Sequence, residues 1–326
     1  MCTAISYAYS DLFCGRTLDV DFNLNERVVI TPRKKPLHFT FLDNINEHLA
    51  VYGIATIEDG TPLYYEAANE KGLFIAGLNF PENAVFHEYK EGLINIAPFE
   101  LIPYILASCK DITGALFLLK KANIVNVSFS EKLPATPLHW FLSDGNNSYT
   151  IESTKDGLNV YENPVGVLTN NPPFPYHMLN LANYANLSSK KQSNGICPDI
   201  PLNFYSNGLS GFGLPGDFSS ASRFVKACFV KHNSICTNVK EALSQFFHIL
   251  NSVSQINGCV RFENGRNEKT FYTSCVNLSK NIFYYKTYYN SQINAVYLDY
   301  ENLDKTDLIC YPLITSENIN VLNKDN

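Results

Sequence analysis

The first third of the chain alternates between apolar and polar residues at the short period of β-strands. Residues 2–9 and 12–18 flank a Ser10-Asp11 turn and predict an antiparallel hairpin, which returns Arg16 toward Cys2. Further strands are expected at residues 27–31, 37–41, 48–56, 63–67 and 73–78. A turn at 69–72 joins the last two of these strands.

Helical spacing replaces this alternation in two parts of the chain. Apolar residues recur at helical spacing from Pro98 onward, with Asp111 as the expected N-cap of a second helix. Residues 219–232 and 238–253 predict two amphipathic helices. The other expected elements are a helical segment at 176–187 inside the irregular stretch 171–220, and strands at 139–142, 149–152, 159–161, 166–169, 270–278, 282–288 and 292–297.

This order of elements predicts the fold class. Strands, two helices, strands, two helices and strands follow one another without βαβ alternation. We therefore expect an α+β protein: a four-layer αββα sandwich of two antiparallel sheets flanked by helices. No break in composition separates domains, so residues 1–326 are expected to form one domain.

Composition narrows the classes of function. Hydrophobic residues make up 45% and charged residues 17%, which is typical of a globular protein, and a net charge of −6 disfavours a nucleic-acid partner. We expect no signal peptide and no membrane span, because no apolar stretch approaches ~20 residues. Nine scattered cysteines favour reduced thiols and a cytoplasmic location.

Familiar cofactor and catalytic motifs are absent or lack their context. Gly211-Phe212-Gly213-Leu214-Pro215-Gly216 matches a dinucleotide fingerprint in spacing, but it contains a proline and follows no strand. The seven histidines are scattered without an HExxH pattern, and the segment around Ser210 fails the GxSxG pattern.

Cys2 is the candidate that remains. Once Met1 is removed, its thiol and its own α-amine can act as nucleophile and base on one residue. The alternative is an ordinary cysteine in an edge strand. Arg16 and Asp19 lie on or just past the adjoining strand, where a guanidinium favours a thiolate and a carboxylate orients an amine; the alternative is a surface ion pair.

Three further polar residues occupy positions where their residue type is unfavourable for the local secondary structure. Asn79 and Asn170 each end an apolar strand, where an amide N–H is a possible donor to an oxyanion; the alternative is a turn-forming role. Arg223 lies in the first turns of a helix, where a positive charge opposes the helix dipole, so another interaction is expected to hold it.

Together these residues resemble a known family. The chain is similar to the bile salt hydrolases, which are choloylglycine hydrolases grouped with the penicillin V acylases among the N-terminal nucleophile hydrolases. The resemblance runs nearly end to end and rests on motifs in the same order: Met1-Cys2-Thr3, Gly15-Arg16 with Asp19, Gly77-Leu78-Asn79-Phe80, Thr169-Asn170-Asn171-Pro172, Gly213 to Asp217, Ser222-Arg223-Phe224 and Asn290 to Val296.

The resemblance implies hydrolysis of the amide that joins glycine or taurine to a bile acid. It implies attack by Cys2, tuning by Arg16 and Asp19, an oxyanion environment at Asn79 and Asn170, and a polar network completed by Arg223. It also implies an αββα sandwich, no cofactor, no metal, and a bacterial cytoplasmic homo-oligomer, often a tetramer. By likeness in position, the walls of a steroid pocket are the 57–62 loop, Leu18, Phe22, Phe129 and Leu133; the alternative for each is core or loop packing.

Two alternatives stay open. Asn79 favours the bile salt branch, because penicillin V acylases tend to carry Tyr there, but the same Cys2 chemistry also suits penicillin V or another N-acyl amide. The second alternative is a binding protein for bile acids or lipids, without catalysis, in which Cys2 has a structural role. If Met1 is retained, the α-amine of Cys2 is blocked as an amide.

Overall fold

Two large antiparallel sheets form the centre of the molecule. The computed structural model describes residues 1–22, 25–191 and 193–323, so residue 192 of the predicted irregular stretch lies outside the described residues. The first sheet has the order β12 (Val167–Leu168), β1 (Cys2–Ala8), β2 (Leu12–Val20), β14 (Asn267–Asn277), β15 (Ile282–Thr287) and β16 (Asn290–Tyr297), with β13 (Val260–Arg261) beside β14.

The second sheet has eight strands. Its order is β11 (Gly157–Glu162), β10 (Ser148–Thr154), β9 (Leu138–Ser143), β6 (Phe74–Asn79), β5 (Thr61–Asn69), β4 (Val51–Glu58), β3 (Arg27–Thr31) and β17 (Ile309–Pro312). Two further strands, β7 (Ile94–Ile96) and β8 (Ala122–Ile124), form a small parallel pair.

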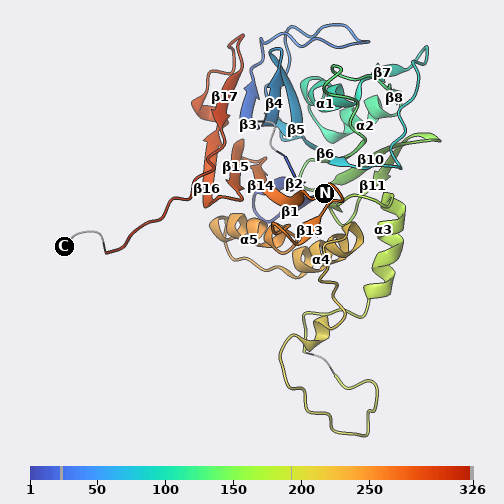
Figure 1. Cartoon of the computed structure of the whole chain (residues 1–326), viewed down its shortest axis with the longest axis vertical. Coiled ribbons are helices and arrows are strands. Elements are labelled where there is room, and N and C mark those ends of the chain that lie inside the picture. The colour runs from blue at the N-terminus through green and yellow to red at the C-terminus, as the bar shows by residue number, and fades with distance from the viewer. Residues whose placement is uncertain (23–24, 192, 324–326) are drawn as a thin grey trace.

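Helices cover the outer faces of both sheets, as Figure 1 shows. α1 (Leu101–Ser108) and α2 (Ile112–Leu119) bury their apolar residues against the eight-stranded sheet. α4 (Ser220–Asn233) and α5 (Val239–Asn251) pack on the other sheet, and Phe246 of α5 meets Phe13 of β2 at a ring separation of 6.3 Å. The predicted αββα sandwich is therefore confirmed.

Side-chain caps explain where three helices begin. Asp111 accepts a hydrogen bond from the amide of Gly114 at 2.8 Å, as its predicted N-cap role requires. Ser219 and Asn238 cap α4 and α5 in the same way, through the amides of Ser222 and Glu241.

Some predicted elements differ from the structure. The strand predicted at 37–41 is wrong: Leu37 forms an isolated bridge to Ile45, and within the described ranges no strand pairs with residues 38–41. β17 and the β7–β8 pair were not predicted. The helix expected at 176–187 is α3 (Phe174–Leu181) followed by a 3-10 turn at Ala182–Tyr184.

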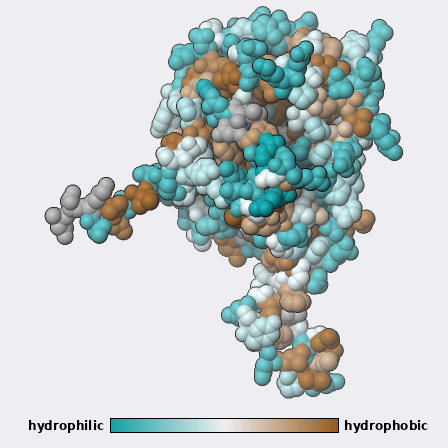
Figure 2. All heavy atoms as spheres, in the orientation of Figure 1, coloured by the Kyte–Doolittle hydropathy of each residue, from teal (hydrophilic) through white to brown (hydrophobic). Residues whose placement is uncertain are grey.

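A long irregular arm leaves the body between α3 and α4 (Figure 1). We call residues 188–191 and 193–210 the arm; its two ends are joined by a hydrogen bond from the amide of Ser188 to the carbonyl of Ser210. Figure 2 shows brown, hydrophobic spheres toward the far end of the arm. The large hydrophobic side chains that the arm exposes are Ile196, Ile200, Leu202, Phe204 and Tyr205.

Candidate active site

Cys2 lies at the start of β1, inside the sandwich rather than at a free edge. β1 pairs with β2 on one side and with β12 on the other, and the register places Cys2 opposite Leu18. Only 4% of the cysteine is exposed. The interpretation of Cys2 as an ordinary edge-strand residue therefore has no support in the position of the strand.

Arg16 directs its guanidinium at the thiol of Cys2. Its Nη2 donates a hydrogen bond to Sγ, while Nη1 donates to the carbonyls of Gly77 and, at 3.2 Å, Tyr65. Nε donates to the carbonyl of Thr17 at 3.2 Å. Burial by itself would lower the pKa of Arg16, but the nearby acidic groups raise it by more, so the pKa lies above its usual value and the guanidinium stays charged.

Asn170 holds the backbone nitrogen of Cys2. Its Oδ1 accepts from that nitrogen at 2.8 Å, and its Nδ2 donates to the backbone carbonyl of Asn79 at 2.7 Å. The side chain of Asn79 is exposed and, among the described residues, makes no hydrogen bond. The two predicted asparagines therefore lie together at the ends of β6 and β12, with Cys2 beside them.

Arg223 joins the same network from α4. Its Nη1 donates to the carbonyl of Cys2 at 2.6 Å and to the hydroxyl of Thr3 at 2.7 Å. Its Nη2 donates to Oδ1 of Asn170 at 2.8 Å, and Nε donates to the carbonyl of Phe218 at 3.0 Å. The guanidinium thus fixes both the backbone of Cys2 and the amide of Asn170, which explains a buried cation in the first turns of a helix.

Asp19 is buried beside the start of the chain. Its carboxylate accepts from the hydroxyl of Thr270 at 2.6 Å and from that of Thr17 at 3.2 Å. Its backbone carbonyl accepts from the Met1 ammonium at 2.8 Å, and its amide donates to the Met1 carbonyl at 2.9 Å.

Met1 is part of this arrangement in the unprocessed chain. Its ammonium forms an ion pair with buried Glu268, and burial is the main cause that lowers the pKa of the ammonium. While Met1 is present, the nitrogen of Cys2 is an amide, so it has no lone pair for taking up a proton.

Sequence reasoning missed the residues that support Asn170. Ser220 accepts from the Asn170 amide at 2.8 Å and donates to Thr169 at 2.9 Å, and His177 donates from Nε2 to the Asn170 carbonyl at 2.9 Å. Burial lowers the pKa of His177 to about 4, so its ring is neutral near pH 7. No local pattern marks these residues, because their contacts depend on how α3 and α4 pack.

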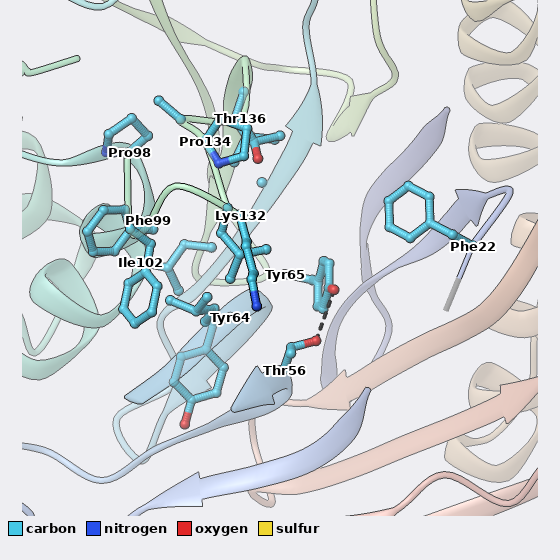
Figure 3. A pocket seen from close by; sticks show the side chains of 16 residues that line it. Phe22, Thr56, Tyr64, Tyr65, Pro98, Phe99, Ile102, Lys132, Pro134 and Thr136 are labelled. Carbon is cyan, nitrogen blue, oxygen red and sulfur yellow. Dashed lines mark hydrogen bonds between the residues drawn. The ribbon is translucent and has the colours of Figure 1, made fainter. Parts of the chain in front are cut away.

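An apolar cavity of about 390 Å³ lies beside this network. Three predicted walls, Phe22, Phe129 and Leu133, line it together with Gly77, whose carbonyl contacts Arg16. Figure 3 shows Phe22 on the opposite side from Phe99, with Lys132 reaching in between and Tyr65 bonded to Thr56.

The other predicted walls lie elsewhere. Leu18 belongs to the buried core and is not among the residues that line this cavity. Residues 59–62 of the predicted loop line a neighbouring cavity of about 250 Å³. In the part of the chain that the structure describes, no group of three or more His, Cys, Asp or Glu side chains is placed to hold a metal ion.

Comparisons with known proteins identify the family of the chain. Residues 2–311 match the model of the linear amide C–N hydrolases, choloylglycine hydrolase family. A bile salt hydrolase/transferase from Lactiplantibacillus plantarum is 48% identical over 314 residues, covering 96% of this chain and 97% of the relative. One from Clostridium perfringens is 37% identical, covering 99% and 100%.

Solved structures give the same result for the fold. The crystal structure of a C2A mutant of a conjugated bile acid hydrolase from Clostridium perfringens superposes with a TM-score of 0.92 at 35% identity, covering 99% of this chain and 100% of that one. A penicillin V acylase from Agrobacterium tumefaciens, 16% identical, shares the fold with a TM-score of 0.75, over 95% and 90% of the two chains. The chain belongs to the choloylglycine hydrolase family of linear amide C–N hydrolases.

Proposed function

We propose that this enzyme hydrolyses the amide bond of glycine- and taurine-conjugated bile salts, with Cys2 as the nucleophile after removal of Met1. The observation that carries the proposal is that Arg16 contacts Sγ of Cys2 while Asn170 binds the nitrogen of the same residue. The relatives named bile salt hydrolase, at 48% and 37% identity over nearly the whole chain, support the choice of substrate.

The first half of the reaction forms a thioester. The thiol of Cys2 gives its proton to its own α-amine, and Sγ attacks the amide carbonyl to form a tetrahedral oxyanion. The α-ammonium then protonates the leaving nitrogen as the C–N bond breaks, releasing glycine or taurine. Arg16 stabilises the thiolate by its charge, and Oδ1 of Asn170 orients the amine.

The second half consumes water. The α-amine takes a proton from a water molecule as the water oxygen attacks the thioester carbonyl and forms a second tetrahedral intermediate. Collapse of this intermediate expels the Cys2 thiolate and releases the free bile acid. We place the oxyanion at the ends of β6 and β12, where the exposed amide of Asn79 is available as a donor. Asp19 and Arg223 hold the strands around Cys2 through the contacts described above.

The cavity suits a steroid. Its lining is mostly apolar and aromatic, and it adjoins the nucleophile through Gly77 and Arg16. We propose that Phe22, Phe129 and Leu133 contact the steroid rings, while the scissile amide projects toward Sγ of Cys2.

Activity assays with defined variants test the nucleophile and the substrate together. Processed wild-type enzyme is expected to lack Met1 by mass spectrometry and to release glycine from glycocholate and taurine from taurocholate faster than it releases 6-aminopenicillanic acid from penicillin V. Cys2→Ala and Cys2→Ser are expected to abolish turnover. Turnover by Cys2→Ala contradicts the role of Cys2, and ligand binding without turnover by the wild type indicates a binding protein.

We also propose that the enzyme is a cytoplasmic homo-oligomer, a tetramer by resemblance, and that residues 1–326 form one domain. Exposed apolar residues on the arm support assembly with further copies of the chain. The nine cysteines are free, as suits a reducing compartment, and one core cluster takes residues from both ends of the chain. Among the described residues, no helix combines the length and apolar character needed to span a bilayer.

A further inference from the structure

A buried carboxylate lies beside the guanidinium of Arg16. Glu66 of β5 is fully buried, and its Oε2 lies 3.8 Å from Nε of Arg16. The same oxygen accepts a hydrogen bond from the hydroxyl of Tyr272 in β14 at 2.7 Å. Three strands from both sheets therefore bring Glu66, Arg16 and Tyr272 together.

A bulge in β5 produces this arrangement. The register between β4 and β5 shifts at Tyr65, so that Ile54 faces Glu66 while Ala55 faces Tyr64. An extra residue in a strand bends it and redirects the neighbouring side chains. Here Tyr65 offers its carbonyl to Arg16, and Glu66 points between the sheets at Arg16 and Tyr272.

Glu66 shares the charge of Arg16 with the Cys2 thiolate. The guanidinium contacts Sγ of Cys2 through Nη2 and faces Glu66 through Nε, so two acidic groups compete for one cation. When Glu66 is protonated, the positive charge is left to the thiolate; when it is ionised, that charge is partly neutralised.

The carboxyl of Glu66 changes its protonation near neutral pH. Burial raises its pKa to about 7, against the lowering effects of Arg16 and of hydrogen bonds from Tyr272 and Ser274; the charge of Glu26 raises it further. Below pH 7 the neutral form predominates, and above pH 7 the carboxylate predominates.

We propose that Glu66 is a positioning residue that holds Arg16 against Cys2 and, through its own protonation, sets how much of the guanidinium charge stabilises the thiolate. The proposal rests on Cys2 being the nucleophile, as proposed above, and adds to it a buried acid that does not touch the substrate.

The pH profile of Cys2 alkylation tests the proposal. Processed enzyme is treated with iodoacetamide between pH 5 and 9, and the modified N-terminal peptide is quantified by mass spectrometry, which separates Cys2 from the other cysteines. In Glu66→Gln the second acid is gone, so the upper part of the profile is expected to move to lower pH by about one unit. The rate above pH 7, where wild-type Glu66 is ionised, is then roughly tenfold higher, and the two profiles converge below pH 7, where Glu66 is neutral. The kcat profile for glycocholate is expected to move in the same direction.

A second variant keeps the test informative if Glu66→Gln folds poorly. Tyr272→Phe removes a hydrogen bond that favours the carboxylate form of Glu66, so the alkylation profile is expected to shift in the same direction by a smaller amount. In the double variant, Tyr272→Phe is expected to add no shift to that of Glu66→Gln. Glu100→Gln is the matched control, because Glu100 is a buried carboxylate bonded to Thr40 and remote from Arg16.

The outcomes separate this proposal from the proposed function. If folded Glu66→Gln and Tyr272→Phe give the wild-type profile, Glu66 serves packing alone and the proposal is overturned. A shift of the same size in Glu100→Gln overturns it as well. Failure of the proposed function has a different signature, because wild-type enzyme then does not turn over glycocholate at any pH.

Discussion

Asn170 uses its side-chain amide fully within the site. Oδ1 accepts from the nitrogen of Cys2 and from Arg223, while Nδ2 donates to the carbonyl of Asn79. The residue was predicted to stabilise the oxyanion, yet in the unprocessed chain its oxygen, not its N–H, faces the nucleophile. Its oxygen is therefore well placed to orient the α-amine that appears when Met1 is lost.

Replacing Asn170 distinguishes these two roles. Asn170→Ala leaves two buried N–H groups without an acceptor, so kcat/KM for glycocholate is expected to fall about 100-fold. Asn170→Asp keeps an acceptor for Cys2 and Arg223, and its loss is expected to be about tenfold smaller. Equal losses in the two variants, measured on processed and folded protein, point to donation by Nδ2 as the essential role.

The site was predictable from sequence where it is local. Cys2 and Arg16 belong to one hairpin, and the hairpin was evident from the Ser10-Asp11 turn and the strands beside it. Asn170 and Arg223 were noticed from their positions at a strand end and in the first turns of a helix, but their roles beside Cys2 came from the resemblance, because their contacts with Cys2 cross the sheet and the helix layer. Glu66 carried no signal, since it becomes an Arg16 neighbour only when the two sheets stack.

At the scale of elements, β2 and β14 approach each other unusually closely at Gly15. A Cβ placed on Gly15 lies 2.1 Å from the carbonyl oxygen of Ser274 and 2.9 Å from Cα of Cys275. Glycine is therefore required there by the neighbouring backbone. The close approach also lets the Arg16 amide donate to the hydroxyl of Ser274 at 3.3 Å, which helps fix the strand that carries the guanidinium.

Gly15→Ala is expected to separate β2 from β14 and displace Arg16. A clash with backbone is relieved only by moving a strand, so we expect a loss of about 1–3 kcal/mol in the free energy of unfolding and a fall in Tm of several degrees, measured by calorimetry. Gly195→Ala is the control, because nothing lies near a Cβ at that position. Equal Tm values for the two variants contradict the explanation.

Helices and strands, like the site residues, were predictable from sequence where the features that determine them are local. Segments with a clear period and a local turn or cap, such as 27–31, 219–232 and 238–253, were predicted within one or two residues of their observed bounds. β17 was missed because it pairs with β3, near the other end of the chain. The strand predicted at 37–41 fails for the converse reason, since a suitable pattern forms no strand without a neighbour.

At the scale of the whole molecule, the arm is the feature that the body of the fold does not explain. Large apolar side chains such as Tyr205, 86% exposed, project from it into solvent. Such exposure is costly unless another surface covers it. The proposed assembly with further copies of the chain would supply that surface.

Charges placed on the arm are expected to weaken assembly. Ile200→Asp combined with Phe204→Asp should lower the mass measured by light scattering toward the 36.7 kDa of one chain, with the wild type near four times that value. Asn203→Asp is the matched control, since it adds one charge to an exposed polar position of the arm. A wild type that remains monomeric at micromolar concentration contradicts the proposed assembly.

The buried ammonium of Met1 has a consequence for how active enzyme is produced. An aminopeptidase must take hold of a free and extended terminus, but here that terminus is enclosed by Asp19 and Glu268 once β1 is in place. We therefore expect excision to come before β14 packs beside β2 and brings Glu268 to the terminus. Chains that fold before excision are expected to keep Met1 and to lack the proposed activity, so the specific activity of a preparation is expected to depend on the fraction of chains that lost Met1 first.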